Sequence, residues 1–171
     1  NNTFTLIWQF EQALNLAQKG DNTLANRNSF LGLKGTWGTA LWGIHDTPYK
    51  TLGRKTTFFY DSIGDNRQVM MHVDDRTDDY IMYFTPDFSG FRVQAGFEFD
   101  QNDADAFNSA TSFAGMAHYA KDALFVGIAY ETLSKGMFSP MEDPDVNSEK
   151  RMRIAGKYTF EKFAVALSYQ M

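Results

Sequence analysis

Residues 91–100 read Phe-Arg-Val-Gln-Ala-Gly-Phe-Glu-Phe-Asp, so every second side chain is apolar and the residues between them are polar or glycine. An alternation of period two predicts a β-strand with one apolar and one polar face, because successive side chains of a strand point to opposite faces. The stretch also has the length of about 9–11 residues that a tilted strand needs to cross a membrane. It therefore predicts a strand that could belong to a membrane barrel.

The same period recurs along most of the chain and predicts an all-β fold. Clear alternation marks four further strands, at residues 3–16, 123–132, 151–160 and 163–171. Weaker alternation, which leaves the orientation of the side chains open, marks strands at residues 28–35, 37–45, 79–85 and 112–121.

The connections between these strands alternate strictly between short and long. Tight turns are expected at Gly35-Thr36, Pro86–Gly90, Lys121-Asp122 and Glu161-Lys162, and long polar loops at residues 18–27, 46–78, 101–111 and 133–150. An outer-membrane barrel has short periplasmic turns and long external loops, whereas a soluble sandwich has no reason to sort its connections by length. The loop lengths therefore favour a transmembrane antiparallel barrel.

Composition excludes several other classes of protein. The 171 residues carry a net charge of −5 and no cysteine, which excludes disulfide scaffolds and thiolate sites and argues against nucleic acid as a partner. The longest apolar run, residues 123–130, is far shorter than the about 20 residues of a spanning helix. The three histidines lack ligand spacing, and no nucleophile or phosphate-loop motif occurs, so we predict no catalytic residue, metal or cofactor.

Alternation alone cannot decide whether the apolar face meets lipid or a second layer of protein. Tyrosines near the predicted strand ends, where interfacial aromatic residues belong, favour the membrane; they are Tyr80, Tyr83, Tyr119, Tyr130, Tyr158 and Tyr169. Two alternatives stay open: a substrate-selective or partner-sheathing outer-membrane barrel, and a soluble carbohydrate-binding or hydrolytic β-sandwich.

Three stretches of the chain, in order and spacing over about residues 4–100, resemble the general trimeric porins of Gram-negative outer membranes. The first is Ile-Trp-Gln-Phe-Glu-Gln at 7–12. The second is Arg-Asn-Ser-Phe-Leu-Gly-Leu-Lys-Gly at 27–35, followed by Gly-Ile-His-Asp-Thr-Pro-Tyr-Lys at 43–50. The third is Arg-Thr-Asp-Asp-Tyr at 76–80 with Pro-Asp-Phe-Ser-Gly-Phe at 86–91.

The resemblance implies a barrel of sixteen strands, of which this chain would hold about nine, from the third to the eleventh. We therefore expect residues 1–171 to be part of a chain about twice as long. The resemblance further implies an outer-membrane homotrimer, in contact with lipid and lipopolysaccharide. Its function would be passive diffusion of small hydrophilic solutes and ions through a water-filled channel, without enzymatic activity.

The resemblance also implies that residues 46–78 fold into the bore as a constriction loop. By motif position, Arg27 and Arg76 correspond to wall arginines; Asp61 and Asp65 are the candidate loop acids that would face them, and Arg54 belongs to the same constriction. The polar faces of the strands would line the bore with Gln9, Glu11, Arg92, Gln94, Glu98, Glu131, Arg151, Arg153 and Lys157. Opposed charges across a narrow passage would create a transverse field.

Overall fold

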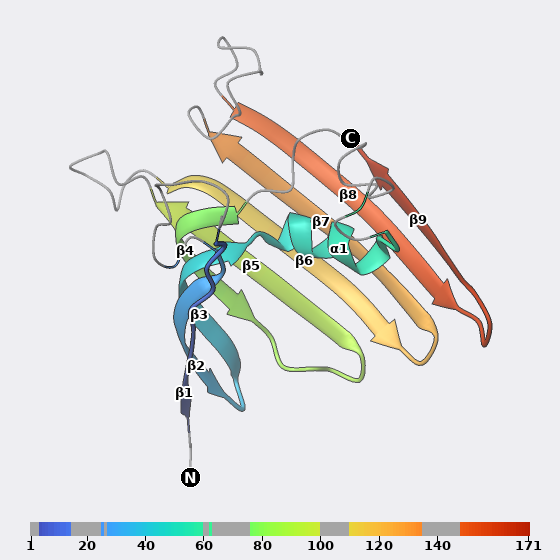
Figure 1. Cartoon of the computed structure of the whole chain (residues 1–171), viewed down its shortest axis with the longest axis horizontal. Coiled ribbons are helices and arrows are strands. Elements are labelled where there is room, and N and C mark those ends of the chain that lie inside the picture. The colour runs from blue at the N-terminus through green and yellow to red at the C-terminus, as the bar shows by residue number, and fades with distance from the viewer. Residues whose placement is uncertain are drawn as a thin grey trace.

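A computed structural model describes residues 4–14, 25, 27–59, 62, 76–99, 110–134 and 148–171. In this part of the chain, nine antiparallel strands form one sheet in which each strand pairs with its neighbours in sequence (Figure 1). The strands are β1 (Thr5–Gln9), β2 (Ser29–Gly35), β3 (Gly38–Asp46), β4 (Arg76–Phe84), β5 (Phe91–Phe99), β6 (Ala110–Lys121), β7 (Leu124–Ser134), β8 (Ser148–Thr159) and β9 (Ala164–Gln170). One helix, α1 (Pro48–Thr56), follows β3. The predicted all-β architecture is confirmed.

Two local predictions differ from the structure. The first strand, expected over residues 3–16, ends at Gln9. Beyond it the regular ladder is interrupted: the Glu11 N–H donates to Ser29 Oγ at 3.0 Å, and the Glu11 carbonyl accepts the Arg27 N–H at 3.1 Å. The helix was not predicted within the loop. Its start follows from Thr47, whose hydroxyl accepts the Lys50 N–H at 3.2 Å, and from Pro48 at the first helical position.

One face of the sheet is apolar and exposed. Phe4, Trp8, Phe97 and Leu167 are 66%, 65%, 44% and 77% exposed. The strand register continues this face across the sheet in rows such as Trp8, Leu31, Trp42, Ile81, Phe97 and Phe113. A soluble sandwich would cover such a face with a second sheet, and the described segments contain no second sheet. We call it the outer face.

Aromatic side chains gather where the short turns lie. Trp37 stacks on Tyr83 with ring centroids 6.1 Å apart, and Phe160 stacks on Phe163 at 4.4 Å. In the turn before β5, the backbone N–H of Gly90 donates to Asp87 Oδ1 at 2.6 Å and lowers the pKa of that carboxyl. Rings at strand ends match the interfacial position that amphipathic aromatic side chains prefer.

The opposite face, which we call the inner face, carries α1. The helix crosses β6, β7 and β8 (Figure 1) and forms an apolar cluster with them: Tyr49, Leu52, Met116, Phe125, Ala129 and Ala155. Gly127 allows this close approach, because a Cβ there would lie 2.7 Å from Leu52 Cδ1. A second inner cluster joins Leu41, Tyr80 and Met82 of β3 and β4. No helix in the described ranges is long and apolar enough to span a membrane.

The expected contact of the outer face with lipid predicts a specific cost for a charge there. Ile128, at the centre of β7, is 44% exposed, so Ile128→Lys removes little packing but places an ammonium in hydrocarbon. We expect about 2–4 kcal/mol of destabilisation, measured by denaturant unfolding in lipid vesicles. Ile128→Leu is the matched control. An Ile128→Lys variant within about 0.5 kcal/mol of the parent, as at an ordinary water-exposed position, would contradict the assignment.

Candidate functional site

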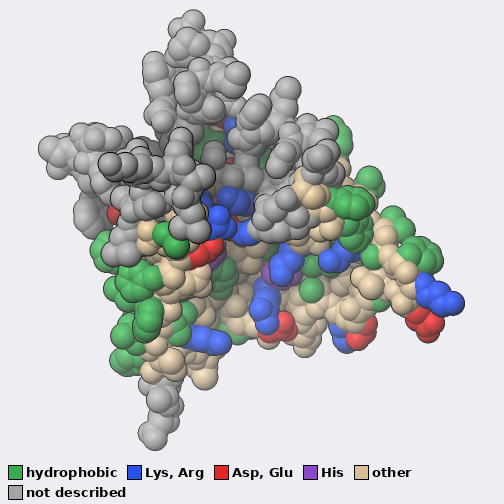
Figure 2. Space-filling view, in the orientation of Figure 1, with side chains coloured by type: hydrophobic (Ala, Val, Ile, Leu, Met, Phe, Trp, Pro, Cys, Tyr) green, Lys and Arg blue, Asp and Glu red, His purple; other side chains and the backbone are tan. Residues whose placement is uncertain are grey.

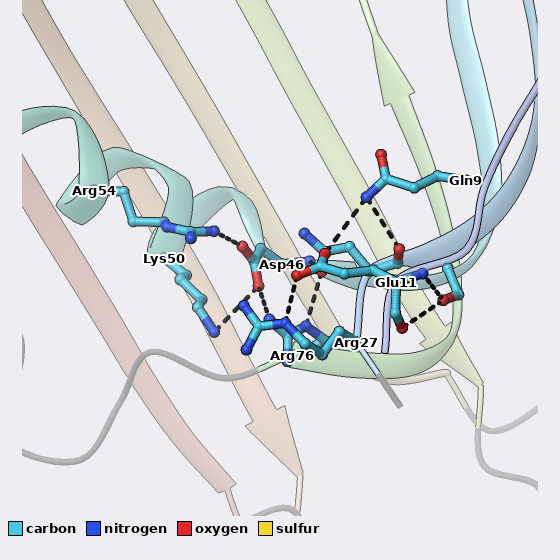
Figure 3. A network of polar contacts seen from close by, with 9 residues as sticks. Gln9, Glu11, Arg27, Asp46, Lys50, Arg54 and Arg76 are labelled. Carbon is cyan, nitrogen blue, oxygen red and sulfur yellow. Dashed lines mark hydrogen bonds and ion pairs between the residues drawn. The ribbon is translucent and has the colours of Figure 1, made fainter. Parts of the chain in front are cut away.

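Asp46, the last residue of β3, is the centre of a cluster of basic side chains on the inner face (Figure 3). Its side chain is only 3% exposed and forms ion pairs with Lys50 Nζ at 3.1 Å, with Arg76 at 3.3 Å and with Arg54. One buried carboxylate thus holds three cations.

The local sequence explains how these side chains meet. Asp46 immediately precedes the N-cap Thr47, so Lys50 and Arg54 follow it one and two helical turns later on the same side of α1. Arg76 opens β4 directly opposite Asp46 in the antiparallel register. The helix and two strands therefore converge on one carboxylate.

A second ion pair extends the cluster toward β1. Arg27 pairs with Glu11, and the neighbouring Asn28 accepts two hydrogen bonds at Oδ1, from the Asp46 N–H at 3.1 Å and from Arg76 Nε at 2.8 Å. Within the ion pairs of this network, four cations meet two carboxylates, which leaves an excess of positive charge. Figure 2 shows basic side chains on this face of the molecule, with hydrophobic side chains at its margins.

Arg153 on β8 anchors the other side of the helix. Its guanidinium lies 4.1 Å from the centroid of the Tyr49 ring, donates to the Tyr49 carbonyl at 3.0 Å and donates to Gln170 Oε1 at 3.1 Å. Arg153 is 2% exposed, so this arginine acts as a bridge between α1, β8 and β9. Nearby, Arg151 pairs with Glu149 at 2.5 Å.

The structure places the predicted lining residues of the strands on one face. The register aligns Gly96, Ala114, Glu131 and Arg151 across β5 to β8. Alternation along these strands, and the register that links Gln9 across the sheet to Glu98, place the remaining predicted strand residues on the same face. These are Gln9, Arg92, Gln94, Glu98, Arg153 and Lys157, while Glu11 lies just beyond β1. Glu131, Arg151 and Arg153 are buried, whereas Gln9 and Arg92 are exposed.

The predicted constriction residues are partly brought together. Arg27, Arg54 and Arg76 meet in one network, and Asp61 and Asp65 lie outside the described residues. Sequence reasoning missed Asp46 and Lys50 as ion-pair partners. Their signal was available: an Asp-Thr-Pro start of a helix followed by a lysine four residues after the aspartate.

The cluster predicts that α1 depends on the Asp46 charge. Asp46→Asn leaves three cations without their carboxylate, which we expect to cost about 3 kcal/mol, the lower end for a broken buried pair, because Arg54 and Arg76 are partly exposed. The α1 amides should then exchange hydrogen about 100-fold faster, as measured by mass spectrometry in detergent. Asp87→Asn, in an exposed turn, is the control. Unchanged exchange in α1 would show that the ion pairs do not hold the helix.

Comparison with known proteins agrees with this geometry. The family described as Gram-negative porin matches residues 1–171. An outer membrane porin protein of Bordetella pertussis (strain Tohama I) is 29% identical over 104 residues, which cover 55% of this chain and 27% of that protein.

Among solved structures, an anion-selective porin from Comamonas acidovorans aligns with a TM-score of 0.71 at 15% identity, over 98% of this chain and 52% of that one. A loop-deletion form of OmpT, an outer membrane protein of Vibrio cholerae, aligns with a TM-score of 0.66 at 19% identity, over 99% of this chain and 56% of that one. The chain thus spans about half the length of these solved porins. Because the family match covers the whole chain, the protein belongs to the Gram-negative porins and is a protein of the outer membrane.

Proposed function

We propose that this chain forms part of a water-filled channel through which small hydrophilic solutes and ions diffuse passively across the outer membrane. The observation that carries the proposal is the division of one continuous sheet into an exposed apolar face and a face that bears charged side chains and a helix. An apolar exterior suits hydrocarbon, and a charged interior holds water. The proposed transport makes and breaks no covalent bond, so the solute gradient drives it.

We further propose that residues 46–78 narrow this channel, and that the strands correspond to the third to eleventh of a sixteen-stranded barrel. The position of α1 supports the first part. The helix is tied to β3 and β4 by Asp46 and to β8 by Arg153, so it lies across the inner face instead of extending from the end of the sheet.

The proposed constriction carries its basic side through Arg27, Arg54 and Arg76, with Asp61 and Asp65 as the acids that face them. In this arrangement Asp46 holds Arg54 and Arg76 in place, and Glu11 holds Arg27. The charges act on passing solutes through a field that is strongest where the passage is narrow and its walls have a low dielectric constant. Dipolar solutes would align in this field, and size would set the upper limit for passage.

The apolar outer face and the family resemblance also suggest the partners of this porin. We propose that the complete porin is a homotrimer and that lipid and lipopolysaccharide contact its outer face. The exposed aromatic and aliphatic side chains of that face support the lipid contact, and the family resemblance supports the trimer.

Channel function predicts a direct electrical result. Porin purified from outer membranes and reconstituted into planar bilayers should give stepwise conductance that is linear in voltage. Chemical cross-linking of the same preparation should give a trimer. A preparation that inserts but leaves the bilayer electrically silent would contradict the channel, and a monomer would contradict only the assembly.

The basic side of the constriction predicts the direction of a change in selectivity. A cation that passes about 7 Å from one removed positive charge gains about 0.6 kcal/mol in a water-like dielectric, a factor of about 3. Arg54→Gln should therefore shift the reversal potential in a KCl gradient toward cations, whatever the selectivity of the parent. Lys162→Gln, in the turn before β9, should leave it unchanged. An equal reversal potential in the Arg54→Gln variant and the parent would place Arg54 away from the ion path.

A further inference from the structure

The inner face of β2 to β4 bears a line of aromatic rings. The rings of Phe30 and His45 lie 5.5 Å apart, and those of His45 and Phe84 lie 5.9 Å apart. All three side chains are partly exposed, and Phe30 and Phe84 pack against the buried cluster of Leu41, Tyr80 and Met82. A wall that only had to hold water would gain nothing from exposed rings.

A groove lies at the turn end of this aromatic surface, between the β2–β3 hairpin and the turn before β5. It has a volume of about 380 Å³, and Ile7, Phe30, Leu41 and Phe84 supply its apolar surface. This volume falls within the range of about 300–1,000 Å³ that small-molecule sites occupy.

Charged groups also line this groove. Lys34 is exposed and makes no ion pair with the described residues, while Arg92 Nε pairs with Asp87 Oδ2 at 2.9 Å. Together the three groups carry one net positive charge. The groove therefore combines apolar surface with a single excess cation.

We propose that this groove binds small organic monoanions that carry an apolar ring, of the aromatic carboxylate class, while they diffuse through the channel. The inference rests on the proposed channel function, because it places the inner face in contact with passing solutes. Phe30 and Phe84 contact the ring, and Lys34 and Arg92 attract the carboxylate. An inorganic anion would gain nothing from the apolar surface, and a neutral sugar has no charge for Lys34 to attract.

The aromatic line also connects this groove with the Asp46 cluster. His45 precedes Asp46 directly, and its ring contacts both Phe30 and Phe84. A ring-bearing anion can therefore remain in contact with side chains of matching chemistry between the proposed constriction and the turn end of the sheet.

The test compares benzoate with acetate, which share the carboxylate and differ in the ring. Saturation-transfer NMR on detergent-solubilised porin measures binding of either anion without requiring conductance. Bilayer recordings in KCl, with benzoate or acetate added, measure the effect on the current. We expect saturable benzoate binding, a saturable decrease of conductance by benzoate, and a much weaker effect of acetate.

Two variants test separately the contribution of the positive charge and that of the aromatic contact. Lys34→Gln should weaken benzoate binding about two- to fivefold, the range for an exposed ion pair. Phe84→Leu should weaken benzoate binding and leave that of acetate unchanged. Lys162→Gln is the matched control and should bind benzoate like the parent. Because Lys34 is exposed, its variant tests the proposal even if the Phe84→Leu protein does not fold.

The outcomes separate this inference from the channel itself. A conducting porin that binds benzoate no better than acetate would overturn the groove and leave the channel intact. Equal binding of benzyl alcohol and benzoate would overturn the carboxylate class, and unchanged benzoate affinity in the Lys34→Gln variant would overturn the role of Lys34. Benzoate binding by a porin that leaves the bilayer electrically silent would instead contradict the proposed channel function and support the binding groove.

Discussion

Hydrocarbon offers no hydrogen-bond partner to a peptide group, so each N–H and C=O of a membrane-spanning strand must be paired within the protein. The antiparallel ladder meets this constraint, and the other properties of the sheet follow from it. Because neighbouring strands are locked in register, apolar side chains form continuous rows on one face and polar side chains on the other. The division into a lipid side and a water side is therefore a consequence of backbone pairing.

On the inner face, side-chain contacts fix the position of α1, which the backbone ladder does not. Asp46 draws together three cations from α1 and β4, and Arg153 fixes the far side of the helix through its contacts with Tyr49 and Gln170. Both anchors are buried charged groups whose partners compensate the cost of removing them from water. The helix is therefore positioned by these polar anchors and by the apolar packing of Leu52.

The sequence allowed the strands to be predicted because alternation is strong where one face is polar, as at Arg92, Gln94 and Glu98. It left the side assignment of β3 and β4 open because apolar residues follow one another there: Leu41 faces inward and Trp42 outward, and Met82 and Ile81 do the same. The inner aromatic surface was missed for this reason. The resemblance pointed to Arg27, Arg54 and Arg76, whereas Asp46, which pairs with Arg54 and Arg76, was not identified before α1 was known. Asp61 and Asp65 stay predictions.

The order of the sheet has a consequence for assembly. Each of the described strands pairs with strands adjacent in sequence, so each hairpin can add to the edge left by the one before it. The contacts of the helix are instead distant in sequence. Arg153 donates to the Tyr49 carbonyl over a separation of 104 residues, and the Tyr49 hydroxyl donates to Gln170 over a separation of 121 residues. The helix α1 can therefore reach its final position only after β8 and β9 have paired with the rest of the sheet. During biogenesis the proposed constriction would therefore be completed last.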